Sequence, residues 1–417
     1  MAYISSIVAS MNHMKERVIL VGAFDRLNFG DLLFPIIFEK MLKHYNFQAK
    51  IDYFGVIESN LSTYGGKATR PLKDLFNDDK LPDHSTIVLV GGEMLAATWT
   101  TIFRYLLPKY GEITLRFLQK LLGSNTTDEI SRQIVGVRND LPWLLCPSSF
   151  SSNVKVVYNS VGGVDILRLS RKHKESLKSA LSEARFISVR DSITKHNLDQ
   201  LDIDNEICIS PDSAIVMSRF FPKRLLLSLV HDKTLSIIEE LHKGYFCFQS
   251  NMYSVKGKEK VIADQLMKIA KEYGMGIVLL PIGIATGHED QIAAKKLKAL
   301  IHNNYAAIVA DNFGVYDIMA LISCCKCFVG TSLHGAITAV SYDIPRVGLT
   351  AKVKKLAAFC STWDDAEMPL CNSVDRLFLS VEKAQSVTQA SLAAVRNRLI
   401  FEYDLTFQKI LSTLSML

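Results

Sequence analysis

Short apolar runs alternate with longer amphipathic stretches along almost the whole chain. A typical unit is a β-branched run, then a turn containing Gly, Asp, Ser or Asn, then a stretch whose apolar residues recur at helical spacing. This alternation is typical of parallel strands joined by helical crossovers. The pattern therefore predicts an α/β fold built on parallel sheets.

The units form two consecutive series. The first series predicts strands at residues 17–21, 49–54, 86–90, 155–159, 186–189 and 206–209. The second predicts strands at residues 245–249, 276–281, 307–309, 327–329 and 346–348. A segment rich in Leu, Lys and His, residues 220–243, separates them and is the predicted interdomain link.

Length and apolar content agree with two domains. The chain has 417 residues, 48% of them hydrophobic, which is too long for one ordinary core. We predict an N-terminal Rossmann-like domain over residues 1–215, a C-terminal Rossmann-like domain over 220–380 and a C-terminal helix over 381–417. Two such halves direct the carboxyl ends of their strands toward a shared cleft, where ligands of open α/β sheets bind.

An insertion at about residues 99–150 departs from this alternation. It combines Trp99, Phe103 and Tyr105 with basic residues such as Arg104 and Arg116. A packed helix pair and a lid that contacts a membrane surface or an acceptor both fit this composition.

Charge and cysteine content narrow the class. There are 48 Lys and Arg against 42 Asp and Glu, a net charge of +6 with no dense basic run, which argues against nucleic acid and weakly suits small anionic substrates. The eight cysteines lack the spacing of a secreted scaffold, and the Cys324–Cys327 pair lacks a second pair for zinc, so we expect reduced thiols and no metal.

With no signal-peptide pattern and no apolar run of ~20 residues, we expect a cytoplasmic protein, with peripheral contact at the inner membrane face left open.

Glycine-rich turns follow three strands of the first series. Asn28, Gly30 and Asp31 precede an apolar helix, and Asn28 is placed to bind a sugar or a carboxylate, whereas Asp31 suits either a helix cap or a catalytic role. The other two turns contain Gly91, Gly92 and Glu93, and Gly162 and Gly163. Glycine lets the backbone approach a ligand closely, so these turns predict the floor of a cleft.

Arg190 leaves a predicted strand just before a helix, so its guanidinium can face the cleft and hold a carboxylate or phosphate. The alternative is an ion pair with the neighbouring Asp191. Asp212, in the turn that follows the next strand, is interpreted first as a helix cap.

The strongest local pattern is in the second series. A strand stops at Val329, and Thr331, Ser332, Leu333, His334 and Gly335 begin a helix that can bind a ligand anion, with the imidazole beside it as proton donor or acceptor. A second strand end brings His288 and Asp290 to a helix start. We give these two residues less weight as functional residues than His334, because carboxylates at a helix start are commonly capping charges.

In order and spacing, these motifs from residue 17 to residue 360 resemble the polysaccharide pyruvyl transferases. The resemblance implies a fold like the GT-B glycosyltransferases and transfer of an enolpyruvyl-derived group from phosphoenolpyruvate to a sugar of a surface polysaccharide or its precursor, forming a pyruvate ketal. It also implies His334 as acid/base, Arg190 as the donor's cationic partner and no obligatory metal or cofactor. The sugar acceptor could be lipid-linked, and its identity and the oligomeric state are not predicted.

One departure concerns the donor site. Some family members have Arg-Leu-His where this chain has Ser332, Leu333 and His334. Arg346 or Lys352 could replace the missing cation, or the donor could differ. The alternatives are therefore a glycosyltransferase that uses a nucleotide sugar and a non-catalytic sugar-binding member of a polysaccharide assembly system.

Overall fold

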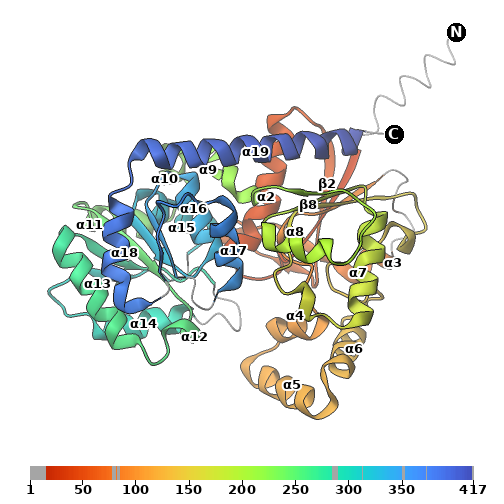
Figure 1. Ribbon diagram of the computed structural model, residues 1–417, viewed down its shortest axis with the longest axis horizontal. Coiled ribbons are helices and arrows are strands. Elements are labelled where there is room, and N and C mark those ends of the chain that lie inside the picture. Colours follow the sequence, from red (N-terminus) through yellow and green to blue (C-terminus); the bar gives the residue numbers. More distant parts are fainter. Residues whose placement is uncertain are drawn as a thin grey trace, which may run out of the picture.

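A computed structural model describes residues 16–77, 81, 85–283, 290–311, 313–349, 353–371 and 373–415. It shows two α/β halves side by side, joined along one edge by the long C-terminal helix (Figure 1). The predicted α/β architecture with parallel sheets is confirmed.

The first half contains a nine-stranded sheet in the order β3-β4-β2-β1-β5-β7-β8-β9, with β6 paired to β7. Neighbouring strands are parallel except for the antiparallel pair β3 and β4. The strands are β1 (Glu16–Val21), β2 (Ala49–Gly55), β3 (Ser59–Asn60), β4 (Ala68–Pro71), β5 (Thr86–Leu89), β6 (Gly92–Glu93), β7 (Lys155–Gly162), β8 (Phe186–Val189) and β9 (Ile207–Ile209).

The second half contains a parallel six-stranded sheet in the order β12-β11-β10-β13-β14-β15. Its strands are β10 (Tyr245–Gln249), β11 (Gly276–Leu279), β12 (Ala307–Val309), β13 (Cys327–Gly330), β14 (Arg346–Leu349) and β15 (Leu370–Cys371). Short strands β3, β4, β6 and β15 were not predicted, because none of them is a continuous run of buried apolar residues.

Helices connect the strands of both halves. In the first half these are α2 (Phe29–His44), α3 (Leu72–Asn77), α4 (Trp99–Leu106), α5 (Lys109–Leu122), α6 (Ser124–Val135), α7 (Arg171–Glu183) and α8 (Ser192–Asp199). From the junction onward they are α9 (Met217–Phe220), α10 (Lys223–Leu227), α11 (Asp232–Glu240), α12 (Met252–Val255), α13 (Glu259–Tyr273), α14 (Asp290–Leu300), α15 (Val315–Cys324), α16 (Leu333–Ser341), α17 (Lys354–Trp363), α18 (Leu377–Gln385) and α19 (Gln389–Ser415). Single 3₁₀ turns are η1 (Ser62–Tyr64), η2 (Pro147–Ser149), η3 (Ile166–Arg168), η4 (Ser213–Val216) and η5 (Val374–Arg376).

Both faces of each sheet are buried, which is why the strands read as continuous apolar runs. Along β1, Val18 and Leu20 belong to one core cluster, and Ile19 and Val21 belong to another. The first of these clusters continues into the second half, where it includes residues of β10, β11 and β13. One hydrophobic core therefore extends across both halves and fixes their relative position on either side of the cleft.

One expectation about helices is corrected. The helix predicted from residue 381 to the C-terminus is two helices, since α18 ends at Gln385 and α19 begins at Gln389. Thr388 accepts a hydrogen bond from the Ser391 N–H at 3.1 Å, which is the capping role that starts a new helix. The predicted interdomain link at residues 220–243 contains the two short helices α10 and α11.

The C-terminal helix α19 returns to the first half after the second sheet is complete (Figure 1). Buried Tyr403 and Asn159 of β7 are hydrogen-bonded at 3.1 Å, and Asp404 forms a bidentate ion pair with Arg219 at 2.6 and 2.8 Å. Packing of the last helix on the first sheet therefore ties the two halves together.

Candidate active site

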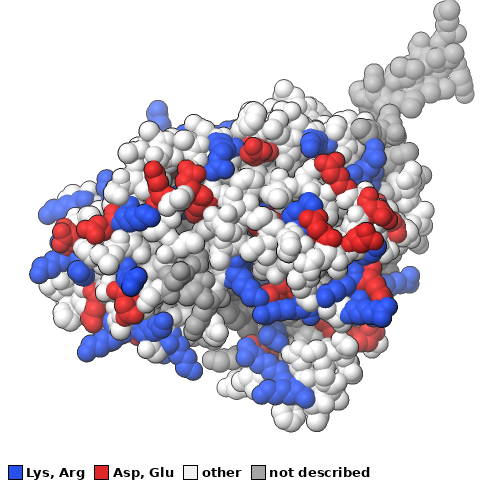
Figure 2. All heavy atoms as spheres, in the orientation of Figure 1, with Lys and Arg blue, Asp and Glu red and all other residues white. Residues whose placement is uncertain are grey.

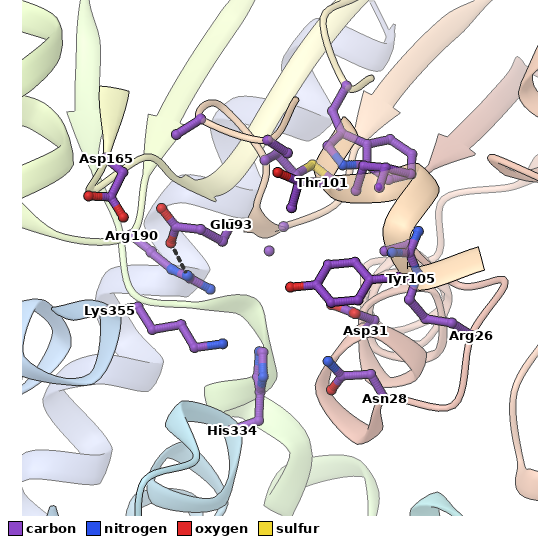
Figure 3. Close-up of a pocket in the computed structure, with 18 residues that line it drawn as sticks. Arg26, Asn28, Asp31, Glu93, Thr101, Tyr105, Asp165, Arg190, His334 and Lys355 are labelled. Atoms are coloured by element: carbon purple, nitrogen blue, oxygen red, sulfur yellow. Dashed lines mark hydrogen bonds and ion pairs between the residues drawn. The ribbon is translucent and has the colours of Figure 1, made fainter. Parts of the chain in front are cut away.

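A cavity of about 390 Å³ lies between the halves (Figure 3). From the first half, its walls come from the start of α2, the turn after β5, the helix α4 and the end of β8. From the second half, His334 of α16 and Lys355 of α17 face the same space. The cavity thus lies at the carboxyl ends of the parallel strands, where sequence reasoning placed the cleft.

The starts of α2 and α16 meet directly beneath this cavity. The Asn28 side chain caps α2 by accepting a hydrogen bond from the Gly30 N–H at 3.3 Å, and it lines the cavity. A Cβ on Gly30 would lie 1.8 Å from Nδ1 of His334. Only glycine leaves room for this imidazole. Gly30 therefore packs against the His334 ring and does not itself line the cavity.

Arg190 lies at the end of β8 with its side chain 2% exposed. Its Nη2 donates to Oε2 of Glu93 at 2.6 Å, and its Nη1 donates to Oδ2 of Asp212 at 3.3 Å. Asp191 does not pair with it and instead caps α8 by accepting from the Thr194 N–H at 2.7 Å. The alternative of an Arg190–Asp191 pair is therefore wrong, and the buried guanidinium faces the cavity within a network of two other carboxylates.

The paired glycines make room for this network. A Cβ on Gly162 would lie 2.6 Å from Oε2 of Glu93 and 2.7 Å from Nε of Arg190. Gly91 and Gly92 line the cavity with φ of +121° and +103°, a region that favours glycine. Gly163 lies behind the wall, where its N–H donates to Thr194 Oγ1 at 2.9 Å.

His334 and Asp212 form a second polar contact across the junction of the halves. Nε2 of His334 lies 3.6 Å from Oδ2 of Asp212, which is buried. Burial would raise the pKa of Asp212, but the adjacent His334 and the positive charge of Arg190 outweigh it and hold this pKa below its usual value. Asp212 also caps η4 through the Ala214 N–H, so the predicted cap is observed along with a contact that the sequence did not indicate.

Asp31 and Lys355 face the cavity from opposite halves (Figure 3). Burial raises the pKa of the Asp31 carboxyl above its ordinary value, although Arg26, His334 and Lys355 act in the opposite direction. Burial also lowers the pKa of Lys355, and Arg190 adds to this effect. Both groups are therefore shifted toward their neutral forms, as is common at sites of proton transfer.

The start of α16 is less open to an anion than the sequence suggested. Oε1 of Gln249 accepts hydrogen bonds from the N–H groups of Thr331 at 3.0 Å and Ser332 at 2.7 Å. The Ser332 hydroxyl caps the helix by accepting from the Gly335 N–H at 3.1 Å. Leu333 is buried in the core, and a Cβ on Gly335 would lie 2.3 Å from the Phe328 ring. Of this motif, only His334 lines the cavity.

The remaining predicted residues lie elsewhere. Asp290 is buried beside the cavity and accepts from Gln249 Nε2 at 2.8 Å and from the N–H groups of Ile282 and Gly283, which indicates a supporting role. His288 and Lys352 fall outside the described residues. Arg346 pairs with Asp364 and does not line the cavity, so it does not replace the missing cation.

Sequence reasoning missed Lys355 and the α4 side of the cavity, Thr101, Ile102 and Tyr105. The sequence contained one indication of a role for Lys355. A cation in the first turn of a helix is unfavourable, so its presence there indicates a role other than stabilising the helix. For α4, the sequence left open a lid that contacts an acceptor and named Tyr105 within it, but it did not indicate which side chains of the helix face the cavity, since aromatic and apolar residues on a helix usually pack in a core.

The eight cysteines are free thiols, and five of them are buried. Among the described residues, no group of three or more His, Cys, Asp or Glu side chains is arranged to hold a metal ion. Within the same residues, none of the helices has both the length and the apolar composition needed to cross a membrane.

Two Rossmann-like halves with a site between them define the GT-B architecture, and comparison with known proteins agrees. The chain belongs to the polysaccharide pyruvyl transferase family, whose model matches residues 28–352, and this membership indicates a transferase. No curated protein sequence matches the chain.

Similar solved structures include the UDP-GlcNAc 2-epimerases of three organisms. For Neisseria meningitidis, in a structure bound to UDP-GlcNAc, the TM-score is 0.52 at 11% identity, covering 96% of this chain and 100% of that one. For Rickettsia bellii it is 0.51 at 13% identity, with 96% and 97% covered, and for Methanocaldococcus jannaschii it is 0.51 at 15% identity, with 90% and 94% covered. At such low identity these matches establish the fold alone.

Proposed function

We propose that this protein transfers the enolpyruvyl-derived group of phosphoenolpyruvate to two hydroxyls of one sugar, forming a pyruvate ketal and releasing phosphate. The observation that carries the proposal is the convergence of Arg190 and Lys355 with His334 and Asp31 around one cavity. Two cations suit a donor that carries a carboxylate and a phosphate. The Asp31 carboxyl, whose pKa is raised, and the imidazole of His334 suit the proton transfers of ketal formation.

Lys355 supplies the cation that Ser332 cannot. Its side chain points into the cavity toward His334 and Arg190 (Figure 3). Among the described residues, no ion pair engages Lys355, whereas Arg190 is already shared between Glu93 and Asp212. Lys355 therefore contributes more to the binding free energy of the donor anion than Arg190 does, and Arg190 adds directional hydrogen bonds.

Ketal formation begins with a proton added to the methylene carbon of phosphoenolpyruvate, which places positive charge on C2 and its oxygen. The first sugar hydroxyl attacks C2 and loses its proton. The C2–O bond to phosphate then breaks, the leaving phosphate takes the electron pair, and the second hydroxyl attacks C2 and loses its proton. Of the two protons released, one replaces the proton given to the methylene group and the other ends on the phosphate.

In this scheme, Asp31 and His334 take the two proton-transfer roles. The raised pKa of Asp31 favours the carboxylic acid, which suits donation to the methylene carbon. His334 is oriented by Asp212, whose charge is maintained by its lowered pKa, and accepts the proton of the attacking hydroxyl. Asn28, on the opposite wall, has an amide that suits a sugar hydroxyl.

The test is phosphate release from phosphoenolpyruvate by the purified protein, with a panel of nucleotide-linked and lipid-linked sugars, followed by mass analysis of the acceptor. A mass gain equal to one pyruvate ketal, absent in His334→Ala, is the expected result. Turnover of a nucleotide sugar without phosphoenolpyruvate would support a glycosyltransferase instead. Sugar binding without turnover of either donor would support a non-catalytic role.

A further inference from the structure

Helix α5 exposes a continuous apolar face at the edge of the first half. Tyr110, Ile113, Phe117 and Leu121 are 86%, 57%, 65% and 68% exposed. Their spacing of three, four and four residues places them on one side of the helix. Leu115, on the opposite side, is buried, so this helix is packed on one face and uncovered on the other.

Basic residues border this face. On the helical wheel, Arg116 and Lys120 lie along one flank of the apolar stripe, and both are exposed. Glu112, the acidic residue of α5, lies on the packed side and is paired with Arg116 at 2.5 Å. Residues 99–138 contain six Lys and Arg against three Asp and Glu, a net charge of +3 in a tenth of a chain whose total is +6.

We propose that the exposed face of α5 docks on an anionic lipid bilayer. A helix with large apolar side chains on one side and Lys or Arg beside them matches the pattern of helices that lie in the interfacial plane of a membrane. Figure 2 shows basic side chains next to uncharged surface on the lobe that carries α5. Negatively charged headgroups complement these basic residues.

A second copy of this chain is a poorer occupant. A two-fold interface would place the α5 face of one copy against the same face of the other. With the two helices antiparallel, this brings the Arg116 and Lys120 flanks together, and with the helices parallel, neither flank meets an acidic residue of the partner's exposed α5 face. Like charges facing each other disfavour association, whereas an anionic bilayer neutralises them. Charge complementarity therefore favours an anionic bilayer over a second copy of the chain as the partner of the α5 face.

The α5 face is coupled to the cavity through α4. Arg104 Nη2 of α4 donates to Gln119 Oε1 of α5 at 3.1 Å, and Thr101 and Tyr105 of the same helix line the cavity. Docking would therefore hold the cavity wall near the membrane surface. If the proposed function holds, the acceptor class that follows is a sugar carried on a membrane lipid.

The experiment is co-sedimentation of the full chain with vesicles of phosphatidylcholine alone and of phosphatidylcholine with added phosphatidylglycerol. We expect binding to the anionic vesicles that falls as salt rises, and a loss on the order of tenfold or more in Phe117→Glu/Leu121→Glu. The matched control is Leu379→Glu/Phe401→Glu, two apolar residues of α18 and α19 that are 58% and 60% exposed, which should bind like the unmodified protein.

Equal thermal stability of both double variants establishes that the comparison concerns binding and not folding. Absence of vesicle binding, equal loss in the control variant, or a dimer in solution that Phe117→Glu/Leu121→Glu dissociates would each overturn the proposal. No donor or acceptor is present in the assay, so its outcome is independent of the proposed reaction.

Discussion

Gly30 of the first half lies directly under the imidazole of His334 from the second half, so close that a Cβ would come within 1.8 Å of Nδ1. The two residues are more than 300 positions apart in the chain. They meet because α2 and α16 both begin at the carboxyl end of a strand and face each other across the cleft. The position of His334 therefore depends on the absence of a side chain at residue 30 in the other half.

Replacing Gly30 with alanine should displace His334 and reduce kcat about 100-fold or more, because a shift of about 1 Å in a catalytic group has that effect. Assays of phosphate release measure it. Gly274→Ala is the control, since Gly274 has a φ of +61° and open space at a distance from the cavity. That variant should lose stability without losing turnover, and equal turnover loss in both variants would contradict the steric explanation.

Replacing His334 with alanine should lower kcat by about 10²–10⁴, the usual contribution of a positioned acid/base. His173 provides a matched control, because its Nε2 lies 3.6 Å from Asp128, the same distance that separates His334 from Asp212. His173→Ala should retain turnover. Full activity in His334→Ala would remove this residue from the mechanism.

Replacing Lys355 with methionine should raise the KM for phosphoenolpyruvate by at least tenfold and leave the acceptor KM nearly unchanged. Since burial lowers the pKa of Lys355, the donor KM of the unmodified protein should rise with pH earlier than an ordinary lysine would allow, and Lys355→Arg should extend binding to higher pH. Lys354→Met, an exposed neighbour on the same helix, is the control. An unchanged donor KM in Lys355→Met would exclude this cation from the donor site.

Replacing Asp31 with asparagine should increase stability and abolish most turnover. The folded state raises the pKa of this carboxyl above 3.8, so its contribution to stability is complete below that pH and is lost as the pH rises through the folded-state pKa. The melting temperature of Asp31→Asn should therefore equal that of the unmodified protein in acid and exceed it, on the order of 2 °C, near neutral pH. Asp204→Asn, in an exposed turn, controls for the loss of one charge. A lower melting temperature near neutral pH would contradict the shift.

Replacing Tyr403 with phenylalanine should destabilise the fold by about 1–3 kcal/mol, because the buried Asn159 amide would lose its hydrogen bond to the Tyr403 hydroxyl. Urea denaturation measures this free energy. Tyr110→Phe is the control, since Tyr110 is almost fully exposed. A loss of less than a few tenths of a kcal/mol would indicate that α19 does not depend on this contact.

Much of the fold could be predicted from local patterns. Buried parallel strands produce short apolar runs, and the helices between them produce a period of 3.6 residues. The ends of the predicted strands therefore lie within two residues of the observed ones, except that β7 continues to Gly162, three residues beyond its predicted end. The same logic placed Asn28, Arg190 and His334 at strand ends, because topology fixes which ends meet at a cleft. The strands β3 and β15 and the break before α19 were missed, since they are set by pairing and capping partners, not by a repeating pattern.

The sequence by itself determined the two-sheet architecture and the strand ends from which the site is built, because hydrophobic periodicity is a property of neighbouring residues. Only the tertiary structure decided which residues meet there. It paired Arg190 with Glu93 and Asp212 in place of Asp191, engaged the N–H groups of Thr331 and Ser332 with Gln249, and brought Lys355 into the position that Arg346 does not fill. These choices depend on distances between groups far apart in the chain, and the local pattern contains no record of them.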